Sequence, residues 1–199
     1  MSSTGGLFRI TVPGQREALV PPAPDRVRAL RRHLIEAIRD MVAARRPERL
    51  IQRRSAEPTG LTANVVGESC GLCQGSCCMA GGTHAFLDDR TMARVHKERP
   101  EMTVRQVISA YVGSVAPLAY RGSCLFHGAA GCTLERPLRA ELCNSYYCNG
   151  LLDFLNANVD AGHAVKIVTH AEQETGTVQP NHPALVRRVK LDAPAPRTD

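Results

Sequence analysis

The stretch CGLCQGSCC, residues 70–78, decides how this chain folds, because it places four cysteines within nine residues. Its spacing is C-x2-C-x3-C-C, so the last two cysteines, Cys77 and Cys78, are neighbours. After 45 further residues, four more cysteines follow with the spacing C-x7-C-x10-C-x4-C. We expect the fold to be organised around these eight thiols: Cys70, Cys73, Cys77, Cys78, Cys124, Cys132, Cys143 and Cys148.

The expected compartment decides what chemistry the thiols do. The opening MSSTGGLFRITVPGQ lacks the basic and apolar regions of a secretory signal. No stretch approaches the ~18 apolar residues of a membrane span. These features predict a cytoplasmic protein, whose thiols are kept reduced. The cysteines then favour metal binding or redox chemistry over a disulfide framework.

The charge of the chain is concentrated in one segment. The net charge is +6, and residues 25–54 account for all of it with ten arginines and four acidic residues. The simpler interpretation is a solvated helix face, and the alternative is a docking surface for a protein partner. Nucleic acid is an unlikely partner, because no aromatic residues are interleaved to stack on bases. We expect no membrane partner.

Hydrophobic periodicity predicts a mainly α fold with Cys-rich irregular loops, a small single domain centred on metal. Expected helices cover residues 25–46 with Asp25 as N-cap, 88–99, a segment after Thr103 that opens with a capping box to Gln106, and the run 151–170. The expected organisation is an irregular lead with a short strand at 7–12 (1–24), a basic amphipathic helix and linker (25–54), the cysteine-cluster metal-binding domain opening with a linker at 55–69 (55–174), and a tail containing Pro and charge (175–199).

Thiolates are soft ligands that select zinc, Cu(I) or iron–sulfur clusters. Eight sulfurs fit two tetrathiolate zinc sites, two cubane [4Fe–4S] clusters, or one four-cysteine centre with four other thiols. Only one C-x2-C turn is present, which favours iron–sulfur over zinc. Side chains of adjacent residues diverge on strands and helices, so we do not expect Cys77 and Cys78 to bind the same ion. They face two different centres, or one is a ligand while the other packs beside it. One of them is expected to join Cys70 and Cys73.

Three segments carry a family resemblance: the C-x2-C-x3-C-C stretch, FLDDRTMARV at 86–95, and CLFHGAAGCTLERPLRAELCNSYYC at 124–148. Together they resemble the YkgJ-like cysteine-cluster family, whose hallmark is eight cysteines, with an Arg-Pro that corresponds to Arg136 and Pro137. The resemblance covers residues 70–150. It implies chelation of zinc or iron by all eight cysteines.

Few other residues suggest chemistry. His84, His96 and His127 lie in or near the cysteine region, and the simplest interpretation of each is a solvated loop histidine; His127 is the best candidate for a ligand. Arg121, Arg136 and Arg139 can neutralise thiolate charge, with Arg136 favoured by the resemblance.

Three functions stay open. The first is an iron–sulfur protein in electron transfer, redox sensing or support of a partner enzyme. The second is a structural zinc module that presents the basic helix. The third is a metal-dependent enzyme that modifies a protein or small molecule, whose catalytic residues the sequence does not identify.

Overall fold

The computed structural model describes residues 7–44, 58–157, 164–170 and 186–190, and about half of these residues are helical. The chain divides into two compact units. Unit 1 draws on Met1–Arg16, Glu57–Ser76 and Tyr147–Asp199, and unit 2 on Glu17–Ala56 and Cys77–Tyr146. The prediction of a mainly α fold is confirmed in part, since about half of the described residues are helical and a sheet that was not predicted accompanies them. Among the described residues, no helix combines the length and apolar character needed to cross a bilayer.

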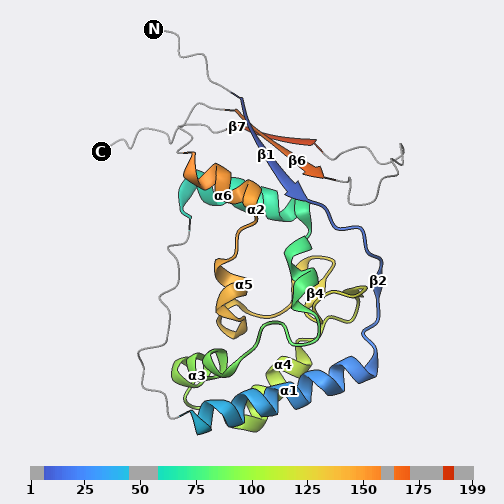
Figure 1. Ribbon diagram of the computed structural model, residues 1–199, viewed down its shortest axis with the longest axis vertical. Coiled ribbons are helices and arrows are strands. Elements are labelled where there is room, and N and C mark those ends of the chain that lie inside the picture. The colour runs from blue at the N-terminus through green and yellow to red at the C-terminus, as the bar shows by residue number, and fades with distance from the viewer. Residues whose placement is uncertain (1–6, 45–57, 158–163, 171–185, 191–199) are drawn as a thin grey trace. The chain divides into compact units, whose positions relative to one another are not determined.

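Unit 1 is a small sheet with helices packed against it. Its strands are β1 (Leu7–Pro13), β6 (Ala164–His170) and β7 (Val186–Lys190), in the order β1-β6-β7. Strand β6 pairs in parallel with β1 and antiparallel with β7. Helices α2 (Gly60–Cys73) and α6 (Asn149–Asn156) lie side by side against the sheet (Figure 1).

The core of unit 1 follows from the alternation of β1. Ile10 and Val12 are buried while Leu7 and Arg9 are exposed, as a period of two requires of a strand with one covered face. Buried side chains of the sheet and of both helices complete this core: Ile10, Val12, Val65, Cys73, Leu151, Phe154, Val165 and Ile167.

Gly150 lets α6 approach the sheet. A Cβ atom at this position would lie 1.9 Å from the carbonyl oxygen of Thr11 in β1. No side chain fits at that distance, so the first turn of α6 rests directly on the strand backbone. The close packing of helix on sheet therefore depends on the absence of a single methyl group.

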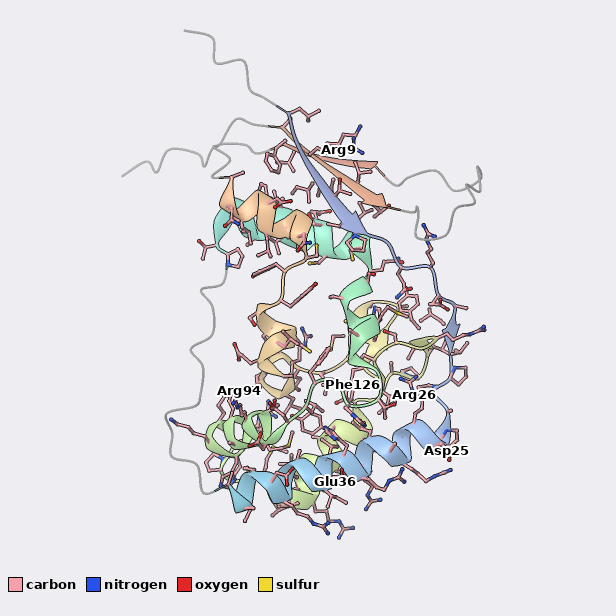
Figure 2. The ribbon with its side chains drawn as sticks, viewed as in Figure 1. Arg9, Asp25, Arg26, Glu36, Arg94 and Phe126 are labelled. Carbon is pink, nitrogen blue, oxygen red and sulfur yellow. The ribbon has the colours of Figure 1, made fainter. Side chains whose placement is uncertain are left out.

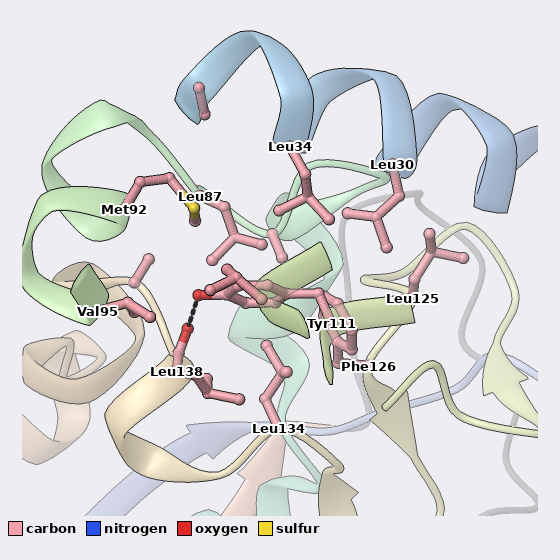
Figure 3. Close-up of a cluster of buried hydrophobic side chains, with 14 of the residues drawn as sticks. Leu30, Leu34, Leu87, Met92, Val95, Tyr111, Leu125, Phe126, Leu134 and Leu138 are labelled. Carbon is pink, nitrogen blue, oxygen red and sulfur yellow. Dashed lines mark hydrogen bonds between the residues drawn. The ribbon is translucent and has the colours of Figure 1, made fainter. Parts of the chain in front are cut away.

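Unit 2 is a helical unit with a well-packed core. Helices α1 (Pro24–Ala43), α3 (Asp89–Glu98) and α4 (Val104–Gly113) surround it. The predicted apolar face of α1 is confirmed, since Leu30, Leu34 and Ile38 are buried. Figure 3 shows Tyr111 and Phe126 between the leucines of α1 and Leu134 of a later loop.

Short elements connect the helices of unit 2. Two-residue strands pair as β2 (Leu19–Val20) with β3 (Ala119–Tyr120) and as β4 (His127–Gly128) with β5 (Gly131–Cys132). The other short elements are the 3₁₀ helices η2 (Ser76–Gly81) and η3 (Arg136–Leu138), and helix α5 (Glu141–Ser145). These small elements carry four of the five cysteines of this unit, and Cys124 lies in the loop before β4.

The predicted helix starts are confirmed at two of three positions. The capping box of Thr103 and Gln106 is present at α4, and Asp88 caps α3 by accepting from the Thr91 amide at 2.8 Å. The cap predicted for α1 is wrong, because Ala23 is the N-cap and Pro24 opens the helix. Proline suits the first helical position, where no amide donor is needed. Asp25 lies in the first turn and pairs with Arg28 (Figure 2 labels Asp25).

Three other expectations are corrected. The predicted linker 55–69 contains most of α2, because burial of Val65 and Cys73 against the sheet outweighs the weak helix propensity of its Gly and Thr residues. The predicted helix 151–170 is instead α6 followed by β6, whose β-branched residues suit a strand. Strand β7 lies in the predicted tail. The last third of the arginine-rich segment, residues 45–54, lies outside the described residues.

Candidate metal centre

The eight cysteines are divided between the units, and all are free thiols. Unit 1 holds Cys70, Cys73 and Cys148, and unit 2 holds Cys77, Cys78, Cys124, Cys132 and Cys143. Few of them lie in irregular loops as predicted. Cys70 and Cys73 belong to the last turn of α2, while η2, β5 and α5 carry four more. Short, regular elements therefore hold most of the thiols.

Unit 2 brings η2 against the loop before β4. The amide of Cys124 donates to the carbonyl of Cys78 at 3.1 Å, so the two backbones are adjacent. Gly81, at the end of η2, makes this approach possible. A Cβ atom there would lie 3.0 Å from the Cβ and 3.4 Å from the Sγ of Cys124. The segment 77–81 thus lies directly beside the Cys124 thiol.

The other two thiols of unit 2 reach the same region from β5 and α5. The charge of Cys132 acts on three other thiols, raising the pKa values of Cys78, Cys124 and Cys143. The charge of Cys77 also raises the pKa of Cys143. The Cys143 thiol donates to the carbonyl oxygen of Ala85, 3.8 Å away. These five thiols act on one another's pKa values, and we call them the five-thiol group.

The vicinal pair interacts through its thiols. Hydrogen bonding between the thiols of Cys77 and Cys78 shifts their pKa values in opposite directions, so divergence of the Cα–Cβ bonds does not keep the two side chains from interacting. Steric divergence of the Cα–Cβ bonds is real on a helix, but side-chain rotation brings the two sulfurs together. That they do not bind the same ion stays a prediction.

Hydrogen bonds and burial set the thiol pKa values. A hydrogen bond from the Cys78 thiol lowers the pKa of Cys77 to about 6. The backbone amides of Cys77 and Cys78 also lower this pKa, while burial raises it. The same bond raises the pKa of Cys78, and burial and neighbouring thiolates raise it further. Burial raises the pKa of Cys124 to about 12 and that of Cys143 to about 11. Most of the group therefore favours neutral thiols unless positive charge is supplied.

Two arginines lie near enough to act on these thiols. Arg26 of α1, labelled in Figure 2, lowers the pKa of Cys124, and its guanidinium also donates to the carbonyl of Ser123. Arg139 lowers the pKa of Cys143. The sequence pointed to Arg139 and favoured Arg136. It missed Arg26, which is about 100 residues from Cys124 and has no local signal.

His127 is buried rather than solvated, contrary to the simplest interpretation of its sequence context. Only 1% of its surface is exposed, and its Nδ1 atom lies 2.7 Å from the hydroxyl of Ser123. Its ring lies against Tyr120, with the centroids 4.6 Å apart. In the β4–β5 hairpin, His127 pairs with Cys132. This imidazole therefore borders the five-thiol group from a rigid position.

The thiols of unit 1 have different surroundings. Cys73 is part of the hydrophobic core, and its sulfur accepts from the amide of Ser76 at 3.4 Å. Cys148 packs partly against that core and is the N-cap of α6. Cys70 is exposed. Ser69, fully buried beside it in α2, has a hydroxyl without a hydrogen-bond partner among the described residues.

The donor set fits a soft metal in chemistry, while its atoms are not arranged as a finished ligand shell. Among the described residues, which include all eight cysteines, no three Cys, His, Asp or Glu side chains surround a common metal position. Cys77, Cys78, Cys124, Cys132 and Cys143 are the residues that would hold a metal in unit 2. Binding requires their side chains to rotate toward a shared point.

Comparison with known proteins adds no assignment. No protein-family model, curated protein or solved structure matches this chain.

Proposed function

We propose that this protein is a metal-binding protein whose centre, an iron–sulfur cluster, is held by the five-thiol group of unit 2. The carrying observation is the gathering of five cysteines from four separate segments: η2, the loop at Cys124, β5 and α5. Cysteines that served only as small apolar side chains would not need to collect at one place. The resemblance to the YkgJ-like family agrees with this function and stays a prediction.

The need for positive charge supports a metal. Arg26 and Arg139 are the cations whose charge lowers the pKa of thiols in the group, against five potential thiolates. A bound metal replaces the thiol protons and supplies the missing charge. Thiolate sulfur also excludes hard ions such as Mg²⁺ and Ca²⁺.

The single C-x2-C turn of the sequence favours iron–sulfur over zinc. Hydrogen bonding by backbone amides also suits a thiolate centre, since the amide of Phe126 lowers the pKa of Cys124 and the amides of Cys77 and Cys78 lower that of Cys77. Such bonds tune the reduction potential of iron–sulfur clusters. Cys77 and Cys143 are exposed, so a cluster held here would lie close to the surface. A role in electron transfer, redox sensing or support of a partner enzyme follows from that placement.

The direct test is anaerobic purification followed by metal analysis, acid-labile sulfide analysis and visible absorption. We expect iron and sulfide in equal amounts and absorption near 400 nm that bleaches in air (~400 nm is typical of thiolate-ligated clusters). Stoichiometric zinc in a colourless, air-stable protein would instead identify a structural zinc module, which chelators would unfold. Protein that takes up neither metal rejects the proposal.

The exposed arginines of α1 offer a place for the partner. Arg28, Arg31, Arg32 and Arg39 are exposed on this helix, although Asp25, Glu36 and Asp40 share its surface. We propose that an acidic protein surface docks here. The charge-reversed variant Arg32→Glu should weaken capture of the partner at low salt, with Glu36→Gln as a control that leaves it intact. Equal capture by both variants would exclude this face.

A further inference from the structure

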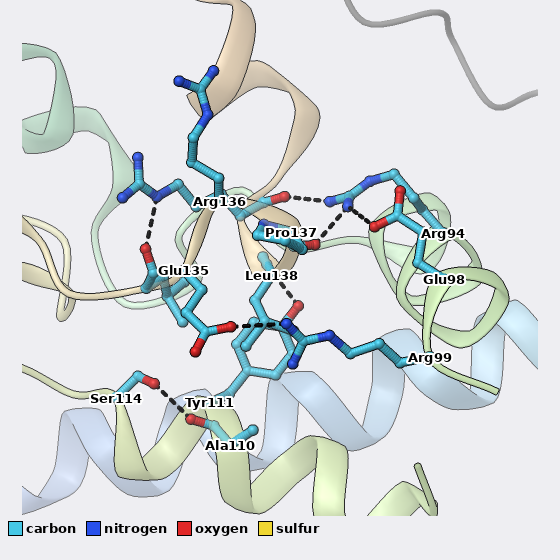
Figure 4. A network of polar contacts seen from close by, with 12 residues as sticks. Arg94, Glu98, Arg99, Ala110, Tyr111, Ser114, Glu135, Arg136, Pro137 and Leu138 are labelled. Carbon is cyan, nitrogen blue, oxygen red and sulfur yellow. Dashed lines mark hydrogen bonds and ion pairs between the residues drawn. The ribbon is translucent and has the colours of Figure 1, made fainter. Parts of the chain in front are cut away.

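The span between Cys132 and Cys143 is held by side chains of other elements. Three successive carbonyls of this span each accept a hydrogen bond from a buried side chain (Figure 4). Arg94 of α3 donates to Pro137 at 2.5 Å and to Arg139, and the hydroxyl of Tyr111 donates to Leu138 at 2.7 Å. A loop held at three consecutive residues has little freedom to move.

Arg94 is an unusual residue to find in this position. Its side chain is 7% exposed, and its carboxylate partner among the described residues, Glu98, lies 3.3 Å away and is itself 38% exposed. Burying a guanidinium costs free energy unless its donors are satisfied. Its planar fork donates to both carbonyls from two different nitrogens in a fixed geometry, which the compact ammonium of a lysine does not reproduce.

Both ends of the span carry this restraint to the thiols. Arg139 donates through Nε to the carbonyl of Leu134 at 2.8 Å and through a terminal nitrogen to that of Cys132 at 3.4 Å. At the other end, the amide of Cys143 donates to the carbonyl of Ala140 at 3.0 Å. The path from the Arg94 guanidinium to each cysteine is therefore a short chain of hydrogen bonds.

We propose that Arg94 is a positioning residue of the five-thiol group, which holds Cys132 and Cys143 together before any metal arrives. This inference deepens the proposed function and rests on it for its purpose. It explains why a buried cation lies far from any thiol along the chain yet is bonded to the loop that carries two of them. The thiol pair is prepared in advance, so less ordering is left for the binding step.

The test measures the thiol pair in the full, reduced, metal-free protein. Dibromobimane joins two neighbouring thiols by two thioether bonds and releases two bromide ions. Peptide mapping then gives the yield of the Cys132–Cys143 link and, in the same sample, of the Cys78–Cys124 link. We expect Arg94→Lys to lower the first yield on the order of fivefold, because a loosened tether lowers effective concentration, and to leave the second unchanged.

Two control variants separate positioning from general destabilisation. Arg99→Lys alters a partly exposed ion pair, at 2.8 Å, between the C-cap residue of α3 and Glu135 of the same loop, and should change neither yield. Leu34→Ala weakens the core of unit 2 without touching the loop, and should lower both yields together. If Arg94→Lys behaves like either control, the proposal is overturned.

A milder variant covers the case in which Arg94→Lys does not fold. Glu98→Gln keeps the guanidinium and removes its carboxylate partner, so the Cys132–Cys143 yield should fall by a smaller factor. An unchanged yield in this variant, with Arg94→Lys unfolded, also overturns the proposal. Metal analysis of the same proteins is independent. Wild-type protein that binds no metal would reject the proposed function, while a selective loss of the Cys132–Cys143 link would still establish the positioning.

Discussion

The two units treat the same side chain in opposite ways. In unit 1, Cys73 is a core residue among Ile, Val, Leu and Phe, and its sulfur accepts an amide at the end of its helix. In unit 2, Cys132 acts on three other thiols, and arginines bring positive charge to the group. The number of cysteines therefore does not indicate what each of them does. The residues that surround each thiol indicate its role, and these residues come from segments that are distant in the sequence.

The strongest way to break this comparison is to remove one thiol from each unit. Cys132→Ser should lower metal affinity at least about 100-fold, since changes merely outside the ligand shell cost 10–100-fold. Cys73→Ser should retain metal and lose about 1–2 kcal/mol of stability, because a hydroxyl enters an apolar core. Metal titration and denaturation of both variants check this.

The opposite result would also be informative. If Cys73→Ser loses metal as fully as Cys132→Ser, the thiols of unit 1 are ligands too. The prediction that all eight cysteines bind metal would then hold. The division into two units would reflect how the backbone packs and would not separate ligands from other cysteines.

The next largest effect concerns the close approach in unit 1. Gly150→Ala should cost at least about 3 kcal/mol, because the new methyl group overlaps the Thr11 carbonyl and α6 must move away from β1. Gly71→Ala is the matched control in α2, where a Cβ meets nothing within 4 Å. It should gain about 0.5–1 kcal/mol from lower unfolded-state entropy. Similar denaturation midpoints for the two variants would show that α6 does not rest on β1.

A glycine in unit 2 gives a smaller effect with a different readout. Gly81→Ala should cost about 1–2 kcal/mol, because its Cβ would press on the side chain of Cys124 rather than on backbone. It should also weaken metal binding, which Gly150→Ala should not do in the fraction that stays folded. Gly113→Ala, with open space around its Cβ, is the control. Full metal affinity in Gly81→Ala would place Cys124 outside the centre.

The smallest effect expected is at Tyr111 and depends on pH. Tyr111→Phe should lose about 0.5–1.5 kcal/mol near pH 8, because the buried carbonyl of Leu138 loses one hydrogen bond. Burial raises the pKa of Tyr111, so its neutral form is favoured in the folded state. That stability is complete below the unfolded pKa of about 10 and is lost as pH rises through the folded value. The difference between wild type and variant should therefore shrink above pH 10.

Denaturation at several pH values measures this difference. Tyr146→Phe is the control, because its side chain is 52% exposed, and it should show no such trend. A penalty for Tyr111→Phe that stays constant to pH 11 would mean that the phenol ionises freely in the folded protein.

Local signals in the sequence predicted local structure well. The apolar face of α1, the capping box of α4 and the cap of α3 depend on residues within a few positions of one another, and all three are present. The start of α1 was missed because proline at the first helical position outcompeted an aspartate one residue later. The sheet was missed because its central strand β6 pairs with a strand from the opposite end of the chain.

The site shows the same limit. Cysteine spacing indicated that thiols matter, and the structure brings five of them together, but spacing gave no sign of which five. Arg26 and Arg94 act through side chains that cross about 40 to 100 residues of sequence. The interaction of Cys77 with Cys78 depends on their side-chain rotamers, which the spacing of cysteines in a sequence does not determine. Long-range contacts and rotamers are what the sequence alone left open.

The pairing of β1 with β6 has a consequence for the order of folding. About 150 residues separate these strands, so β1 leaves the ribosome long before its partner exists. The described residues of unit 2, between 17 and 146, are all synthesised before β6. Their helices and core can therefore assemble while β1 is still unpaired. We predict that pulse-labelled hydrogen exchange during refolding protects α4 before β1, and equal protection times would contradict this. A protein built in this order prepares its thiols before it closes its sheet.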